Sequence, residues 1–139
     1  MARTELRTSS GDLKSIDAGE SCIVTATMTD TTGADLSTSS VLTLTATLLN
    51  ASDGAVINSR NAQDILNTNG GALADDGNGS ATLTLSLLPA DNPNVGTAVG
   101  SLEEHYLLIT WTWQDDDAVT QTGKKEWVLY IRPLTTPVP

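Results

Sequence analysis

Three segments of the chain alternate aliphatic residues with threonine or serine. They span residues 21–29, 41–49 and 80–88 and read SCIVTATMT, VLTLTATLL and SATLTLSLL. A period of two with many β-branched residues predicts strands with one buried and one solvated face. The side chains predicted to face the core are Cys22, Val24, Ala26, Met28, Leu42, Leu44, Ala46, Leu48, Leu83, Leu85 and Leu87.

Two further alternating segments, 104–114 and 124–132, predict a closing hairpin. Their sequences are EHYLLITWTWQ and KKEWVLYIR, and the acidic run Asp115–Asp117 begins the loop between them. The pattern predicts an apolar face that includes all three tryptophans of the chain. That face carries Leu107, Ile109, Trp111, Trp113, Trp127, Leu129 and Ile131, while Tyr106 and Tyr130 lie on the opposite faces.

The connections between these segments are rich in turn-forming residues. Asp53-Gly54 predicts a hairpin, after which residues 55–58 pair back onto the preceding strand. Residues 61–66 are predicted to form one helical turn, and NGGALADDGNG at 69–79 is predicted to be a loop. Pro89 ends the strand before it, because proline cannot donate to a central ladder.

Strands joined by turns predict an all-β protein, an antiparallel immunoglobulin-like β-sandwich of about seven strands. We assign the sandwich to residues 20–133. Residues 1–19 are polar and locally neutral, and they are interpreted as an N-terminal arm with a short strand at Leu13–Asp17. Residues 134–139 form a C-terminal tail after a proline.

Composition limits the partners and the compartment. The chain has 139 residues and a net charge of −10, with a sequence pI near 4.1, so we expect no nucleic-acid partner and no membrane partner. Cys22 is the only cysteine, which leaves no internal disulfide. We expect no signal peptide at the N-terminus and no membrane span, and therefore synthesis in the cytoplasm.

Histidine chemistry has little support in the sequence. His105 is the only histidine, and with Cys22 it falls short of the ligand set of a typical zinc site. A hydrolase that uses His105 as its base is a possible interpretation, but no nucleophile-elbow motif accompanies it. We assign no catalytic, cofactor-binding or metal-binding residue, and we predict a protein that is not an enzyme.

Paired carboxylates suggest two other kinds of site. Asp75-Asp76, Glu103-Glu104 and Asp115–Asp117 have the residue type of a glycosidase pair, but they lie in or beside loops where water keeps them ionised. The loop ADDGNGS at 74–80 offers oxygen ligands to calcium without the EF-hand spacing. Aspartate, asparagine and glycine are also common turn residues, and that structural interpretation is preferred.

The aromatic residues raise the alternative of a carbohydrate-binding or adhesin-type module. Exposed aromatic rings stack on sugars, but Trp111, Trp113 and Trp127 fall at the inward positions of their strands. Tyr106 and Tyr130 are better candidates for a surface patch, and Tyr106 is also a candidate for a tyrosine corner.

The order of strands and turns resembles small immunoglobulin-like virion proteins of tailed bacteriophages. The residues that carry the resemblance are IVTATMTDTTGADLSTSSVLTLTATLLNASDGAVIN, and then GNGSATLTLSL, EEHYLLITWTW and KKEWVLYIRPL. Such proteins decorate heads or accompany tails. The resemblance implies a structural protein of the virion without a cofactor, present in many copies or as a homo-oligomer. The expected function is capsid decoration by binding the major capsid protein lattice, and a tail or head–tail accessory role is the alternative.

Overall fold

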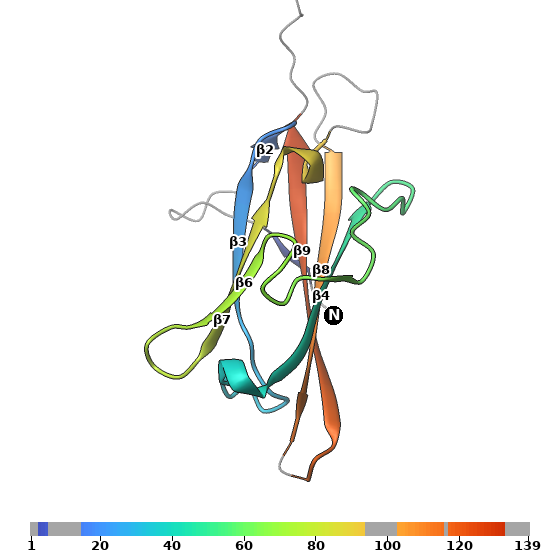
Figure 1. The fold of residues 1–139 in the computed structure, drawn as a ribbon. Coiled ribbons are helices and arrows are strands. Elements are labelled where there is room, and N and C mark those ends of the chain that lie inside the picture. Colours follow the sequence, from blue (N-terminus) through green and yellow to red (C-terminus); the bar gives the residue numbers. More distant parts are fainter. Residues whose placement is uncertain (1–2, 6–14, 94–102, 116, 133–139) are drawn as a thin grey trace, which may run out of the picture.

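A computed structural model describes residues 3–5, 15–93, 103–115 and 117–132. The described chain forms two β-sheets that face each other, with two short 3₁₀ turns, η1 (Thr38–Ser40) and η2 (Pro89–Asp91) (Figure 1). The larger sheet contains β1 (Arg3–Glu5), β2 (Ser15–Asp17), β4 (Val41–Asn50), β5 (Gln63–Asp64), β8 (Glu103–Gln114) and β9 (Thr120–Arg132). The smaller sheet contains β3 (Cys22–Thr27), β6 (Gly71–Asp75) and β7 (Ala81–Leu87). The prediction of an all-β, two-sheet protein is confirmed, and immunoglobulin-like connectivity stays a prediction.

The larger sheet is built around the β8–β9 hairpin. Its strand order is β1-β9-β8-β4-β5, and β2 also pairs with β9. The hairpin register places Trp111 opposite Gly123. Both β1 and β2 run parallel to β9, so the prediction of a wholly antiparallel fold is wrong at this edge. Alternation along one strand carries no information about the direction of its neighbour, which is why the sequence missed this pairing.

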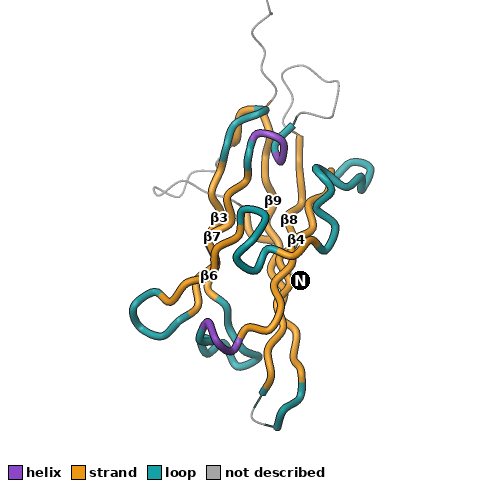
Figure 2. The backbone as a smooth tube through the Cα atoms, in the orientation of Figure 1, coloured by secondary structure: helices purple, strands orange, loops and turns teal. Residues whose placement is uncertain are grey.

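The smaller sheet has the order β3-β7-β6, with antiparallel pairs throughout. Its third strand corrects the prediction of a loop at 69–79, because Gly71–Asp75 pairs with β7. Gly71 is required there, since a Cβ at this position would overlap the carbonyl of Ile65. The predicted helical turn at 61–66 is also wrong, because Gln63–Asp64 is extended and pairs with β4 (Figure 2).

The start of β4 departs from its predicted alternation. The pairing of β4 with β8 shifts register between Val41 and Thr43. The shift is a bulge that changes which residue faces inward, so Val41 is buried and Leu42 is 46% exposed. Beyond β4, the Asp53-Gly54 turn is confirmed, because the Asn50 N–H donates to the Ala55 carbonyl at 2.9 Å.

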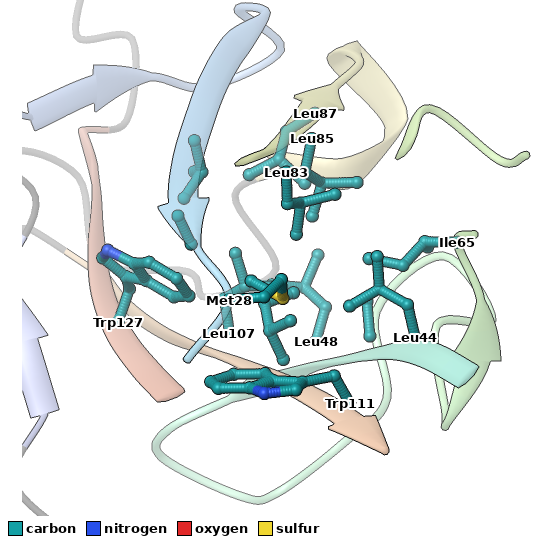
Figure 3. Close-up of a cluster of buried hydrophobic side chains, with 14 of the residues drawn as sticks. Met28, Leu44, Leu48, Ile65, Leu83, Leu85, Leu87, Leu107, Trp111 and Trp127 are labelled. Carbon is teal, nitrogen blue, oxygen red and sulfur yellow. The ribbon is translucent and has the colours of Figure 1, made fainter. Parts of the chain in front are cut away.

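The core lies between the two sheets and consists of aliphatic residues with three tryptophans (Figure 3). Apart from Leu42, every side chain predicted to face the core is buried. Burial of a leucine-sized side chain contributes on the order of 1.5–3 kcal/mol. The largest fully buried side chains are Ile16, Met28, Leu44, Leu48, Ile65, Leu83, Leu85, Leu87, Leu107, Ile109, Leu129 and Ile131.

The predicted N-terminal arm contributes strands to the larger sheet. Ile16 in β2 is fully buried, and the Ala18 N–H donates to the Arg132 carbonyl at 2.9 Å. The short strand predicted at Leu13–Asp17 therefore exists as β2, over Ser15–Asp17. The division into arm, sandwich and tail stays a prediction, and the tail at 134–139 lies outside the described residues.

Candidate functional site

A groove of about 660 Å³ opens between the two sheets, towards the end that carries the β8–β9 hairpin. One wall is formed by β3 and the loop after it, with a contribution from β7. The other wall is the first half of β9, and β8 supplies two tryptophans. The lining residues are Thr25, Ala26, Thr27, Thr29, Asp30, Thr31, Thr82, Trp111, Trp113, Thr122, Gly123, Lys124 and Lys125.

Trp111 reaches the groove because its neighbour on β9 is a glycine. A Cβ at Gly123 would lie 2.6 Å from the Trp111 Nε1 and Cζ2 atoms, so the indole covers the place of a side chain. The indole N–H donates to the Thr29 carbonyl at 3.1 Å, which ties β8 to the loop after β3. Trp111 and Trp113 are each only 4% exposed. The groove therefore offers indole edges and no open ring face for stacking.

Within the described chain, one backbone edge of the first half of β9 has no strand beside it. The Asp115 N–H donates to the Val119 carbonyl, and the Ala18 N–H donates to the Arg132 carbonyl. Along a strand in an antiparallel ladder, successive residues direct their backbone N–H and C=O groups alternately to one side and the other. Because Val119 bonds towards β8 and Arg132 bonds towards the chain after β2, the even-numbered backbone groups of β9 point away from β8. β1 pairs beside residues 126–128 and β2 beside 130–132. Among the described residues, no strand pairs with this edge at Thr120, Thr122 or Lys124.

A second edge, on β3, faces the same groove and has no partner strand in the described part of the chain. The Met28 N–H donates to the Ala81 carbonyl at 3.0 Å, so the odd-numbered backbone groups of β3 point away from β7. These groups belong to Ile23, Thr25 and Thr27, and the two threonines have exposed side chains. Two strand edges, one from each sheet, thus border one groove.

The groove carries two cations. Lys124 and Lys125 are exposed, and in the described part of the chain neither forms an ion pair with a carboxylate. The ammonium of Lys125 lies 5.1 Å from the centroid of the Trp127 ring. Asp30 also lines the groove, but its carboxylate accepts hydrogen bonds from Thr32 and Ala34 in its own turn. These bonds, the one from the Thr32 hydroxyl first, lower the pKa of Asp30.

His105 lies in a different part of the molecule. It is six residues from Trp111 along β8, which is about 20 Å at roughly 3.3 Å per residue. The ring is fully buried, and its Nε2 lies 2.7 Å from a carboxylate oxygen of Glu103. Burial lowers the pKa of His105, and this outweighs the opposing effect of Glu103. Within the described chain, the ring Nδ1 has no hydrogen-bond partner.

The acidic loops use their carboxylates to hold turns. Asp76 accepts from the Asn78 N–H at 2.7 Å, and Asp115 accepts from the Val119 N–H at 2.9 Å. Asp75 accepts from the Thr38 N–H at 3.4 Å. Over the residues that the structure describes, no three His, Cys, Asp or Glu side chains gather as a metal site. Cys22 and His105 are both buried, and no described contact joins them.

Sequence reasoning missed a buried ion pair at the opposite end of the sandwich. Arg60 Nε lies 2.6 Å from Asp91 Oδ1, and Arg60 Nη2 lies 3.0 Å from Asp91 Oδ2. Asn58 and the Leu88 N–H also donate to this carboxylate. Burial favours a higher pKa for Asp91, but these donors outweigh it and hold the pKa below its usual value. A lone arginine and aspartate 31 residues apart gave no local signal of their contact.

The two tyrosines that the sequence suggested for a surface patch are not fully exposed. Tyr106 and Tyr130 are half-buried, so neither presents a fully open ring.

The helical segments found in the described chain are single 3₁₀ turns, and none could cross a bilayer.

Comparison with known proteins returned no matching family model, no matching curated protein and no matching solved structure.

Proposed function

We propose that this chain is a non-enzymatic structural protein of a phage virion, which decorates the capsid by binding the major capsid protein lattice. The observation that supports a binding role is the groove between β3 and β9. Two strand edges and two lysines border it, and within the residues that the structure describes the edges have no partner strand and the lysines have no carboxylate partner. Exposed strand edges are templates for association with another chain. The choice of partner rests on the phage-like order of strands and turns in the sequence.

Charge and copy number are compatible with this proposal. A net charge of −10 keeps separate copies apart in solution before docking. A homo-oligomer of such a small protein would gain avidity, because its linked copies could engage several sites of a repeating lattice at once. The buried His105 and the half-buried Glu103 lie away from the groove, so the proposal requires no chemistry from them.

The proposal is tested with empty shells assembled from the major capsid protein encoded in the same genome. Purified protein is titrated onto the shells, which are then pelleted, and the bound protein is measured per capsid subunit. We expect saturation at a fixed ratio and added density on the shell by electron microscopy. Absence of the protein from the pellet at every concentration would overturn the decoration function.

A tail or head–tail accessory role is the closest alternative, because a β-sandwich with an open edge suits either location. Separated heads and tails of the same phage distinguish the two. Binding to tails alone would replace the decoration function with the accessory one.

A carbohydrate-binding role is the other alternative, and the presence of Trp111 and Trp113 in the groove is the observation in its favour. Sugar recognition by stacking requires an open ring face, whereas each of these residues is 4% exposed. A glycan array that gives binding, together with a sugar-dependent change in tryptophan emission, would support this alternative over the capsid one.

A further inference from the structure

We propose that the Thr120–Lys125 edge of β9 binds an extended acidic segment of a partner protein as an added β-strand. The proposal rests on the proposed function, from which it takes a protein as the partner. It goes further by naming the edge, the conformation of the bound segment and its charge.

The backbone of β9 supplies the first argument. β1 and β2 already occupy the second half of this edge, beside residues 126–132. The Thr120, Thr122 and Lys124 backbone groups continue the same row of donors and acceptors, with no partner in the described chain. An extended segment of about six residues spans roughly 20 Å, which matches the length of the open stretch. It would extend the larger sheet in line with β1 and β2.

The groove supplies the second argument. A strand added to β9 lies roughly 4.8 Å from it, on the side towards β3. Inward side chains of this strand would enter the 660 Å³ groove, beside Lys125 and the edge of Trp111. Gly123 has no side chain, and the Trp111 indole lies where one would be. The groove lined by these two residues extends to β3. The site therefore accommodates a strand with side chains on both faces.

Charge identifies the class of segment. Successive residues of a strand point to opposite faces, so Lys124 and Lys125 present an ammonium group on each side of the edge. Edge lysines deter neutral or basic strands, because pairing would bury their charge without a partner. Asp or Glu on both faces of an incoming strand would pair with the two lysines, so strand addition would no longer leave their charge without a partner. A second copy of this chain is disfavoured at this edge, because the two strand edges that border the groove, residues 22–27 and 120–125, carry no Asp or Glu to pair with the lysines.

The test uses the full chain as bait for a library of random 12-residue peptides at low ionic strength. We expect the selected peptides to be rich in Asp, Glu and β-branched residues. The Lys124→Gln/Lys125→Gln variant should weaken the best peptide at least tenfold by fluorescence anisotropy. Its matched control is Asn61→Asp/Asn78→Asp, which changes the net charge equally at two exposed sites and should leave affinity unchanged.

Amide hydrogen exchange then reports where the peptide lies. Added-strand pairing should slow exchange at the Thr122 and Lys124 amides, which face the open edge, while Gln121 and Gly123 are already bonded towards β8. Thr122→Pro removes one of these donors without touching the β8 ladder, and it should abolish binding. If that variant misfolds, the lysine variant and the exchange pattern still decide the question.

Three outcomes would overturn the inference. They are a selection without acidic peptides or without binders, equal weakening by the control variant, and protection at Ile23, Thr25 and Thr27 in place of Thr122 and Lys124. Failure of capsid binding is a separate result. If shells do not bind but acidic peptides protect β9, the capsid proposal falls and the strand-binding edge stands.

Discussion

At the end of the sandwich that carries β2 and η2, the charged side chains of Arg60 and Asp91 are paired in the interior. At the β8–β9 hairpin end, which Figure 1 shows opposite the β2 end, Lys124 and Lys125 line an open groove. At the first end, Asn92 donates to the Glu20 carbonyl and its own carbonyl accepts from the Gly19 N–H, which joins η2 to the turn after β2. At the second end, Lys124 and Lys125 have no carboxylate partner in the described chain.

The two ends differ because the two halves of β9 have different neighbours. The second half of β9 is covered on both edges and encloses Ile131 against Ile16 and the rest of the core. Among the described strands, only β8 pairs with the first half, and the Trp111 indole fills the interior beside Gly123. The indole therefore shields the core from solvent, although no described strand pairs with this part of the β9 edge. We expect substitutions at the closed end to change stability, and those at the open end to change binding.

Asp91→Ala should have the largest effect on stability. It leaves the Arg60 guanidinium buried without its partner, which costs about 3–5 kcal/mol. Because the pKa of Asp91 is lowered in the folded state, its stabilising contribution is complete above the unfolded pKa of about 3.9. It is lost as the pH falls below that value, through the lower folded pKa. Urea denaturation at pH 7 measures the loss.

Asp117→Ala is the matched control, because Asp117 is exposed at the tip of the hairpin. Its free energy of unfolding should change by less than about 0.5 kcal/mol. Equal losses from the two substitutions would contradict the distinction between the closed end and the open end.

Gly123→Val should have the next largest effect, and it tests the packing beside the groove. The added side chain overlaps the Trp111 indole, and overpacking of this kind costs about 1–3 kcal/mol. Displacement of the indole should also shift tryptophan emission to longer wavelength. Thr122→Val, on the outer face of the same strand, should change neither quantity appreciably. An unshifted emission maximum in the glycine variant would show that the indole does not depend on this gap.

Much of the two-sheet body could be predicted from the sequence, because alternation is a local property. The apolar inward positions of β3 were found in this way, as were those of β8, those of β9 that carry Trp127, Leu129 and Ile131, and those of β7 apart from Ala81. His105, also buried in β8, was not placed inward. The exceptions have identifiable causes. Leu42 is exposed because a bulge resets the alternation, and β6 lacks the alternating pattern because glycine and alanine fill it.

The groove could not be predicted, because it depends on which strands become neighbours. Trp111 and Trp113 were correctly placed inward, but nothing in β8 alone shows that its partner at Trp111 is a glycine. Likewise, the buried contact between Arg60 and Asp91 joins two irregular segments, and irregular segments carry no period from which a register can be read. Sequence reasoning therefore found the core and missed the arrangement of its edges.

A smaller effect is expected from the buried histidine. Because the pKa of His105 is lowered by burial, the unfolded chain binds more protons below its usual value of about 6.5. The free energy of unfolding should therefore fall by up to about 1.4 kcal/mol per pH unit as the pH drops below 6.5. His105→Gln removes this contribution, so the difference in stability between the two proteins should vary over pH 5–7. A difference independent of pH would contradict a neutral, buried imidazole.

The smallest effect is expected from Lys124→Gln/Lys125→Gln, and its smallness is informative. Neither lysine has a carboxylate partner among the described residues, and the contact of Lys125 with Trp127 is worth about 0.5 kcal/mol at an exposed site. The free energy of unfolding should therefore change by no more than about 0.5 kcal/mol, measured by urea denaturation at pH 7. A loss above about 1 kcal/mol would mean that the fold itself requires these cations. A stable variant would show that the fold does not require these cations, so a loss of peptide binding in the same variant can be assigned to the edge itself.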